Sequence, residues 1–347
     1  MHTDVHPSVL LVGLGAVGRA VGARLLAGSR CEIVGAVDPS PAFAGEELAA
    51  VIPGASAAVR VSPSLAEAPD ADIAFVATTS LLADVEPILM QLLDRGTHAV
   101  SICEQLGFGF IDRDPIAARL DARARSLGLT ILGTGCNPGI LLDTLPLLLS
   151  SLVPEVTGVT MRRTAEMSGY GGILSKFGFG LAPAEFAAAR EAGTVIGHVG
   201  FRESVAALAD GLGWRLDEIV VDDPQPALLT DSPRATSHLT LEAGTIAVLR
   251  HSARGIANGR TVIDAAIDFG IFATGDPFPE GDNWRIEGLD ESLEFSSSRI
   301  DSYESTVAVA ANVIPSIGSL APGLLTMADV PVKRFAGAGT APGGSAR

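Results

Sequence analysis

The feature that most constrains this chain is a glycine-rich turn near its start. The apolar run Ser8 to Val12 is typical of a strand, the turn Gly13 to Gly18 (GLGAVG) follows it, and Arg19 to Leu26 has a helical pattern. A second strand is expected over Glu32 to Val37, and Asp38 closes it about twenty residues after the turn. This order of strand, turn, helix and acidic residue predicts a dinucleotide-binding βαβ unit. A glycine turn in another α/β fold is the alternative.

Each glycine of the turn has its own expected role. Gly13 permits the tight turn, Gly15 lets the backbone approach a pyrophosphate, and Gly18 lets the helix pack closely on the strand. Ala16 and Val17 begin the helix, whose free N–H groups and positive dipole end attract phosphate. We therefore predict that these five residues bind the pyrophosphate of the cofactor.

The residues around the second strand bear on the choice between NAD and NADP. Asp38 would accept hydrogen bonds from the ribose hydroxyls and would repel a 2′-phosphate, which favours NAD. Arg19 and Ser40 could instead bind a 2′-phosphate, so NADP stays open. Three further candidates follow the next long strand: Thr78, Thr79 and Ser80. We expect them to contact the ribose or nicotinamide half of the cofactor, with helix capping as the alternative.

The rest of the chain divides into two patterns. Further strands are expected over Ala58 to Val61, Ile73 to Ala77, Ala99 to Cys103 and Thr130 to Leu132, with helices over Leu81 to Leu93 and Pro115 to Leu127. After Leu149 come long alternating stretches over Glu155 to Met167, Gly244 to Ala257 and Arg260 to Phe272, a glycine-rich loop over Ser168 to Gly180, and a helix over Ser302 to Val313. Alternating strands and helices predict an α/β domain with a doubly wound parallel sheet, and the long strands predict an α+β domain on a mixed or antiparallel sheet.

These patterns predict a dinucleotide-binding Rossmann domain over residues 1–150 and a substrate-binding and dimerisation domain over 151–335. The helix over 302–313 could pack back on the first domain. The tail over 336–347 is rich in glycine, alanine, proline and serine, which predicts disorder.

Composition excludes several classes of function. The net charge is −16 and the isoelectric point is near 4.7, which argues against nucleic acid as a partner. The mean hydropathy is +0.36, yet no apolar run approaches the roughly 18 residues of a membrane span. The start of the chain lacks a secretory signal pattern, so a cytoplasmic protein is expected. The cysteines Cys31, Cys103 and Cys136 are scattered and predict no metal site.

Glu104 is the strongest candidate for chemistry. It follows the expected strand over Ala99 to Cys103, at an edge where a nicotinamide would lie, and apolar Ile102 and Leu106 flank it. Such surroundings raise the pKa of a carboxyl group and suit it to general acid and base catalysis. A surface glutamate that starts a loop is the alternative.

Four short motifs carry a resemblance to a known family. They are Ser101-Ile102-Cys103-Glu104, the glycine-rich turn Gly133 to Gly139 that is expected to open a helix, Gly197-His198-Val199-Gly200 before Glu203-Ser204-Val205, and Pro322-Gly323-Leu324-Leu325-Thr326. In order and spacing, from about Val9 to Phe335, they resemble the 2,4-diaminopentanoate dehydrogenase family. That family is related to dihydrodipicolinate reductase and includes the native amine dehydrogenases.

The resemblance implies a homodimer that uses NAD or NADP to oxidise a small primary amine to a ketone or aldehyde and ammonia, or catalyses the reverse reductive amination. It implies that Glu104 is the catalytic residue. It implies substrate-binding roles for Asn137 and Pro138 near the nicotinamide, for His198, and for Tyr170 and Phe177 in a covering loop that also holds Lys176.

The chain also departs from related families. It lacks the paired histidines, the lysine and the Ser-Gly-Thr turn of true dihydrodipicolinate reductases. A substrate carboxylate would need a cation, and Arg162, Arg163 and Lys176 are the candidates, although arginines on an alternating strand usually face solvent. A ketone or aldehyde without a carboxylate is therefore equally open. The alternatives are another oxidoreductase of this superfamily, such as a diamino-acid dehydrogenase, or a non-catalytic NAD(P)-binding sensor.

Overall fold

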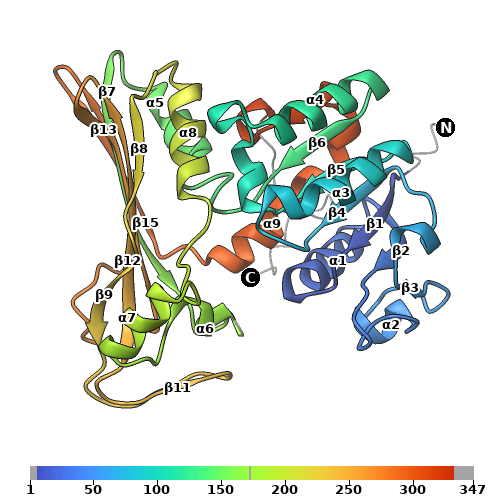
Figure 1. Ribbon diagram of the computed structural model, residues 1–347. Helices are drawn as coiled ribbons and strands as arrows, with labels where there is room; N and C mark the ends of the chain where they lie inside the picture. Colours follow the sequence, from blue (N-terminus) through green and yellow to red (C-terminus); the bar gives the residue numbers. More distant parts are fainter. Residues whose placement is uncertain (1–5, 172, 332–347) are drawn as a thin grey trace, which may run out of the picture. The chain divides into compact units, whose positions relative to one another are not determined.

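The computed structural model describes residues 6–171 and 173–331, so the predicted disordered tail over 336–347 lies outside the described residues. The chain divides into two compact units, coloured along the sequence in Figure 1. Unit 1 comprises Met1–Gly139 and Glu304–Arg347, and unit 2 comprises Ile140–Tyr303. The predicted division lies at residue 150, whereas the structure divides after Gly139 and returns to unit 1 at Glu304.

Unit 1 contains a seven-stranded sheet in the order β16-β6-β5-β4-β1-β2-β3, and every strand pair in it is parallel. Its strands are β1 (Ser8–Val12), β2 (Glu32–Val37), β3 (Val61–Ser62), β4 (Ile73–Val76), β5 (His98–Ser101), β6 (Thr130–Gly133) and β16 (Gly323–Leu325). The expected doubly wound α/β architecture is confirmed.

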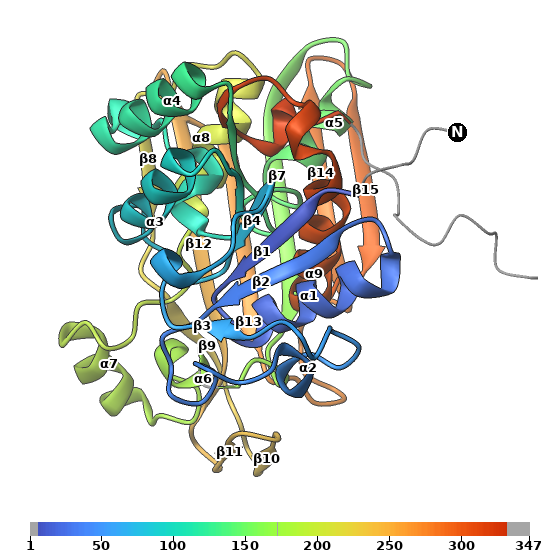
Figure 2. The same ribbon diagram turned by 90° about the vertical axis from the view of Figure 1, so that its right-hand side faces the viewer.

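Helices cover both faces of this sheet (Figure 2). The α-helices described in unit 1 are α1 (Ala16–Gly28), α2 (Leu48–Val51), α3 (Leu82–Asp94), α4 (Pro115–Leu127) and most of α9 (Ser302–Val313). The apolar faces of α3 and α4 pack in one buried cluster with Leu10 of β1 and Ile131 of β6. The next residue of β1, Leu11, points to the opposite face and lies against Gly22 of α1. This alternation is the normal consequence of strand geometry.

Unit 2 contains a mixed sheet in the order β15-β14-β7-β13-β12-β8, in which β7 and β13 are parallel and the other pairs are antiparallel, with β9 also paired to β12. Its strands are β7 (Val156–Glu166), β8 (Glu218–Val221), β9 (Gln225–Leu229), β12 (Ile246–Ala257), β13 (Arg260–Gly270), β14 (Gly281–Gly288) and β15 (Ser292–Ser298). A small hairpin, β10 (Arg234–Ala235) and β11 (Thr240–Leu241), lies apart from this sheet. The expected mixed sheet is confirmed.

One face of the unit 2 sheet is covered by α5 (Thr144–Ser150) and α8 (Phe201–Gly211). Trp284 of β14 is fully buried there and its indole N–H donates to the Leu141 carbonyl at 2.6 Å. The opposite face carries ion pairs between neighbouring strands, such as Arg250 with Asp268 at 2.7 Å. Two more short helices complete this unit: α6 (Ile173–Phe177) and α7 (Pro183–Glu191).

The two neighbouring arginines of β7 point to opposite faces of this sheet. Arg162 pairs with Asp264 at 2.6 Å on the face that carries the ion pairs. Arg163 is on the covered face, where its side chain and that of Asp282 are both fully buried and lie 3.1 Å apart. The expectation that both arginines face solvent is therefore wrong for Arg163, because Asp282 compensates its charge.

Three local expectations are also corrected. Only Val61 of the expected strand over Ala58 to Val61 is in β3. β5 ends at Ser101, so Glu104 does not follow the strand directly but opens the short 3-10 helix η2 (Glu104–Phe108). The turn that ends at Gly139 opens no helix, since α5 begins at Thr144. Among the described residues, no helix has the length and apolar character needed to cross a membrane.

Candidate active site

The glycine-rich turn fits a bound pyrophosphate. Gly13 has φ +92°, and a Cβ atom placed on it would lie 2.5 Å from the Ala77 carbonyl oxygen. A Cβ atom on Gly18 would lie 1.9 Å from the Gly13 carbonyl oxygen, so α1 can approach β1 only with glycine here. A Cβ atom on Gly15 meets no atom within 4 Å. The space beside Gly15 at the start of α1 is thus open, as a phosphate-binding helix N-terminus requires.

Asp38 is held beside this turn. Its carboxylate accepts hydrogen bonds from the backbone N–H of Leu14 at 2.7 Å and of Ser40 at 2.9 Å. Arg19, in the first turn of α1, places its guanidinium 5.5 Å from the centre of the Phe43 ring. The structure therefore brings Asp38 and Ser40 together and places Arg19 against the segment that follows them.

The three hydroxyl residues after β4 differ in their surroundings. Thr78 is exposed. Thr79 accepts a hydrogen bond from the N–H of Leu81 at 3.3 Å and donates to Asp84 at 3.4 Å, both at the start of α3. The Ser80 hydroxyl hydrogen-bonds the Glu104 carboxyl group. Thr79 thus bonds locally before α3 without capping it, since the N-cap residue of α3 is Leu81 and its side chain makes no capping hydrogen bond, whereas Ser80 is directed to another loop.

Glu104 lies where two neighbouring parallel strands, β4 and β5, end. Burial raises the pKa of its carboxyl group, and hydrogen bonds from Ser80 and from its own backbone N–H offset part of that rise. The helix η2 that Glu104 opens is packed tightly, since a Cβ atom on Gly107 would lie 2.5 Å from the Pro138 ring. The backbone that carries Glu104 is consequently held in place, and its carboxyl group holds its proton to higher pH than an exposed glutamate does.

The turn around Asn137 and Pro138 lies against this helix. In this turn, the backbone N–H of Cys136 donates to the Thr306 hydroxyl of α9 at 3.1 Å. The Thr134 hydroxyl lies 3.1 Å from the Met327 sulfur. These two supporting residues, Thr306 and Met327, are not among the predicted site residues. The motif around Pro322 pointed to this region, but no local pattern marks Thr306.

In unit 2, His198 and Phe177 belong to one aromatic cluster. The rings of both residues contact Phe269, with centroids 5.5 Å and 5.1 Å away, and His198 also contacts Phe201 at 5.2 Å. The backbone N–H of His198 donates to Nδ1 of His251 at 3.1 Å. Phe177 is almost fully buried.

His198 is an uncharged imidazole in this cluster. Burial, with the neighbouring His251 and Arg163, lowers its pKa to about 3. Among the described residues, none makes a hydrogen bond to its buried Nε2 atom. A polar atom left in this way in an apolar cluster is available to a ligand.

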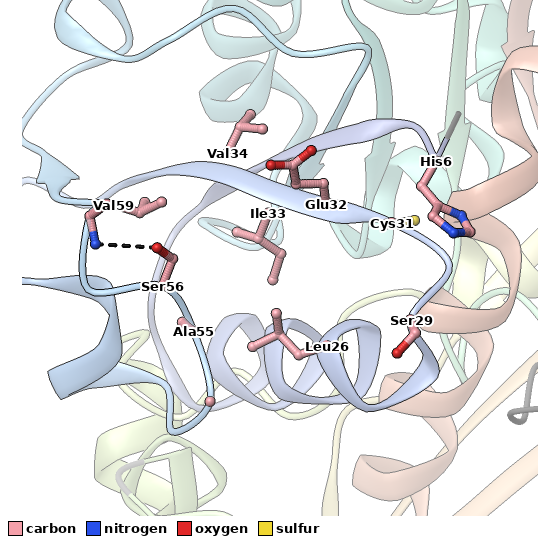
Figure 3. Close-up of a pocket in the computed structure, with 12 residues that line it drawn as sticks. His6, Leu26, Ser29, Cys31, Glu32, Ile33, Val34, Ala55, Ser56 and Val59 are labelled. Atoms are coloured by element: carbon pink, nitrogen blue, oxygen red, sulfur yellow. Dashed lines mark hydrogen bonds between the residues drawn. The ribbon is translucent and has the colours of Figure 1, made fainter. Parts of the chain in front are cut away.

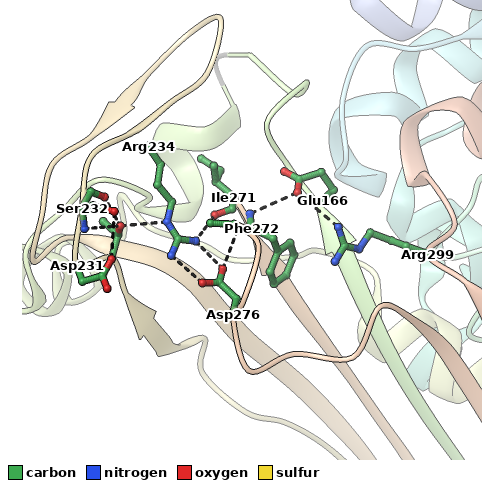
Figure 4. A network of polar contacts seen from close by, with 10 residues as sticks. Glu166, Asp231, Ser232, Arg234, Ile271, Phe272, Asp276 and Arg299 are labelled. Carbon is green, nitrogen blue, oxygen red and sulfur yellow. Dashed lines mark hydrogen bonds and ion pairs between the residues drawn. The ribbon is translucent and has the colours of Figure 1, made fainter.

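The start of the predicted covering loop is held by contacts within unit 2. Tyr170 packs edge-on against Tyr303 with ring centroids 5.9 Å apart. Glu166, at the end of β7, accepts hydrogen bonds from Ser168 and Phe272 and lies 3.7 Å from Arg299, as Figure 4 shows in part. The loop contains the short helix α6, on which Lys176 is exposed.

A cavity elsewhere in unit 1 contains none of the predicted site residues. This cavity, of about 720 Å³, lies beside the amino-terminal end of β2, with Ser29, Cys31 and Glu32 in its wall (Figure 3). Asp38 follows the opposite end of the same strand.

All three cysteines are buried, and burial raises the pKa of the Cys31 thiol to about 11. The described residues include no group of three or more side chains suited to a metal ion.

Comparisons with known proteins agree with the resemblance in the sequence. A 2,4-diaminopentanoate dehydrogenase from Acetoanaerobium sticklandii is 28% identical over 340 residues, covering 94% of this chain and 94% of that protein. An amine dehydrogenase structure from Mycobacterium smegmatis matches with a TM-score of 0.83 at 22% identity, over 96% of this chain and 99% of its own. An oxidoreductase domain protein from Kribbella flavida matches with a TM-score of 0.53 at 13% identity, over 93% and 92% of the two chains.

The two structures show a shared fold, and a family model shows the relationship. The model of the 2,4-diaminopentanoate dehydrogenase C-terminal domain matches residues 140–340, more than half of the chain. The resemblance that the motifs carried is therefore confirmed. The chain belongs to the 2,4-diaminopentanoate dehydrogenase family.

Proposed function

We propose that this chain is an amine dehydrogenase that uses NAD or NADP to interconvert a primary amine with a ketone or aldehyde plus ammonia. The observation that carries the proposal is Glu104, a carboxyl group of raised pKa at the carboxyl edge of a dinucleotide-binding sheet. The names of the 28% identical relative and of the structural neighbour point to the same chemistry.

The residues of unit 1 fit the cofactor. Gly13, Gly15 and Gly18 with the start of α1 would hold the pyrophosphate, and Asp38 would accept hydrogen bonds from a ribose. When bound, the nicotinamide ring exchanges a hydride with the substrate carbon. Arg19 and Ser40 lie near Asp38 and could bind a 2′-phosphate, so NADP is also a candidate cofactor.

Glu104 would move the protons of the reaction. Its carboxylate takes a proton from the substrate ammonium group, which leaves a neutral amine able to become an iminium ion. Once this proton has passed to solvent, the regenerated carboxylate stabilises the iminium cation and takes a proton from the water molecule that adds to it. In the resulting carbinolamine, Glu104 transfers the proton that allows ammonia to leave. A raised pKa suits this exchange near neutral pH.

His198, Phe177 and Tyr170 would bind the carbon skeleton of the substrate, and Asn137 and Pro138 would line the site near the nicotinamide. The His198 cluster is aromatic and uncharged, which suits an apolar substituent.

Two of the three cations considered for a substrate carboxylate already have acidic partners. Arg162 pairs with Asp264 and Arg163 pairs with Asp282. These pairs favour a substrate without a carboxylate over a diamino acid. A cytoplasmic homodimer remains part of the proposal, and light scattering would measure the oligomeric state.

A steady-state screen tests the function. Simple primary amines and diamino acids would be offered with NAD⁺ and NADP⁺, and the matching ketones with ammonia and the reduced cofactors. Turnover of carboxylate-free amines supports the proposal, and turnover of diamino acids alone supports the diamino-acid alternative. Cofactor binding by calorimetry with no turnover of any amine would favour the sensor alternative.

A further inference from the structure

Two loops of unit 1 are tied together beside Glu104. One follows β4 and contains Ser80, and the other follows β5 and contains Glu104 and Gln105. The N–H of Gln105 donates to the Ser80 carbonyl at 3.2 Å, and the N–H of Leu82 donates to the Gln105 side-chain oxygen at 2.8 Å. Gln105 therefore holds the β4 loop through both its backbone and its side chain.

This tie places the Ser80 hydroxyl at the Glu104 carboxyl group, where it makes a hydrogen bond. On the other side of η2, Leu106 is fully buried and Gly107 lies against Pro138. The backbone that carries Glu104 is thus held from both sides. The side chain of Glu104 can still rotate, and a hydroxyl donor can restrict that rotation.

We propose that Ser80 is a positioning residue for Glu104, and that Gln105 fixes Ser80 in that role. The hydroxyl donates to the carboxylate, holds it in one orientation and stabilises its charged form. The assignment rests on the proposed function only in taking Glu104 as the reactive group. It differs from the cofactor contact that the sequence analysis expected of Ser80, and the two roles have different measurable consequences.

The direction of the effect follows from the chemistry of the pair. A donated hydrogen bond favours a carboxylate over the neutral acid and so lowers its pKa, against the rise caused by burial. Without the hydroxyl, the pKa of Glu104 should rise further. Activity that needs the carboxylate should then be lost at higher pH than in the wild type.

The test compares Ser80→Ala with Ser80→Thr, which keeps a hydroxyl, and with Ser126→Ala, which removes an exposed hydroxyl from α4. Infrared or ¹³C NMR titration of the carboxyl groups, with Glu104→Gln to assign the signal, reports the Glu104 midpoint without any turnover. Calorimetry reports cofactor affinity, and the pH dependence of kcat with the preferred amine reports function.

In Ser80→Ala we expect the Glu104 midpoint and the acid limb of kcat to move up by about one pH unit, as loss of a charge-assisted hydrogen bond implies. We expect kcat below that limb to fall roughly tenfold, in proportion to the lost carboxylate. Cofactor affinity should stay near the wild-type value, and Ser80→Thr should restore the midpoint. Ser126→Ala should match the wild type.

An unmoved Glu104 midpoint in Ser80→Ala would overturn the assignment. Weakened cofactor binding with an unmoved midpoint would return Ser80 to the role of a cofactor contact. If Ser80→Ala does not fold, Gln105→Met keeps the side-chain size but loses the acceptor for Leu82, and it should raise the midpoint in the same direction. If the wild type turns over no amine, the proposed function fails, while the titration still decides the role of Ser80.

Discussion

Glu104 combines a partly buried side chain with hydrogen-bond donors that support its charged form. Replacing it by glutamine keeps the size of the side chain and removes both the charge and the transferable proton. We expect Glu104→Gln to bind cofactor normally and to lose turnover by on the order of 10²-fold or more, the range of general acid–base catalysis. Amine oxidation and reductive amination should fall together, because both directions pass through one transition state.

Steady-state rates in both directions and calorimetric cofactor affinity measure this effect. Glu218→Gln, at an exposed position in β8, is the matched control and should behave as the wild type. Near-normal rates for Glu104→Gln would remove this residue from the mechanism, and with it the main support for amine chemistry.

His198 links the acid stability of the protein to its aromatic cluster. Its folded pKa is about 3, below the ordinary value of 6.5, so the unfolded chain binds this proton more readily. Stability from this residue is complete above about pH 6.5 and declines as the pH falls toward 3. By pH 5 the loss should be on the order of 1–2 kcal/mol. Urea unfolding at pH 7 and pH 5 measures it, and His198→Gln should show a smaller decline. An equal decline in both proteins would mean that His198 titrates normally.

At the scale of elements, the glycine-rich turn allows a clean test of cofactor binding. A Cβ atom at Gly15 meets no protein atom within 4 Å, whereas one at Gly18 would clash with the Gly13 carbonyl. Gly15→Val should therefore fold and yet fail to bind either cofactor, because the branched side chain occupies the space of the pyrophosphate. Calorimetry measures the affinity and circular dichroism checks the fold. Wild-type affinity in a folded variant would contradict the Rossmann assignment.

The end of β2 sets the expected cofactor preference. Asp38→Ala should weaken NAD more than NADP, because it removes the ribose acceptor and the charge that repels a 2′-phosphate. It also removes the acceptor for Leu14, so some loss for both cofactors is expected. Asp38→Asn keeps one carbonyl acceptor and therefore measures the effect of removing the charge alone. Dissociation constants for both cofactors decide the question, and equal losses would show that Asp38 does not discriminate.

Elements with strong local signals were predictable. The helix α4 has the expected bounds, since Asp114 accepts a hydrogen bond from Ile116 at its start and Gly128 ends it with φ 69°. The short strand β3 was misplaced and β16 was not predicted, because two or three residues carry no periodicity and exist only through their partners.

Prediction of the candidate site is limited in the same way, because contacts between distant residues leave no local pattern. The turn and the place of Glu104 followed from local motifs, but the contact between Ser80 and Glu104 joins two separate loops. The burial of Arg163 depends on Asp282, more than a hundred residues away. Such pairs are set by tertiary packing, which cannot be read from the local pattern of a single sequence.

At the scale of the whole molecule, the Arg163–Asp282 pair should matter more to stability than the ion pairs on the opposite face. Asp282→Ala removes the carboxylate that lies 3.1 Å from a fully buried guanidinium and should cost about 3–5 kcal/mol of unfolding free energy. Asp264→Ala removes the acidic partner of Arg162 and should cost about 0–1 kcal/mol. Urea denaturation measures both. Similar losses for the two variants would show that the buried pair is not critical.

The return of the chain to unit 1 has a consequence for biosynthesis. β16, at Gly323–Leu325, forms the edge of the parallel sheet beside β6, and Thr306 supports the turn that follows β6. A ribosome therefore releases all of unit 2 before the residues that complete the sheet of unit 1 emerge. During that interval β6 of the nascent chain exposes an unpaired edge, the kind of surface that pairs with other chains and that chaperones shield. The sheet of unit 1 is therefore completed only after unit 2 has been synthesised.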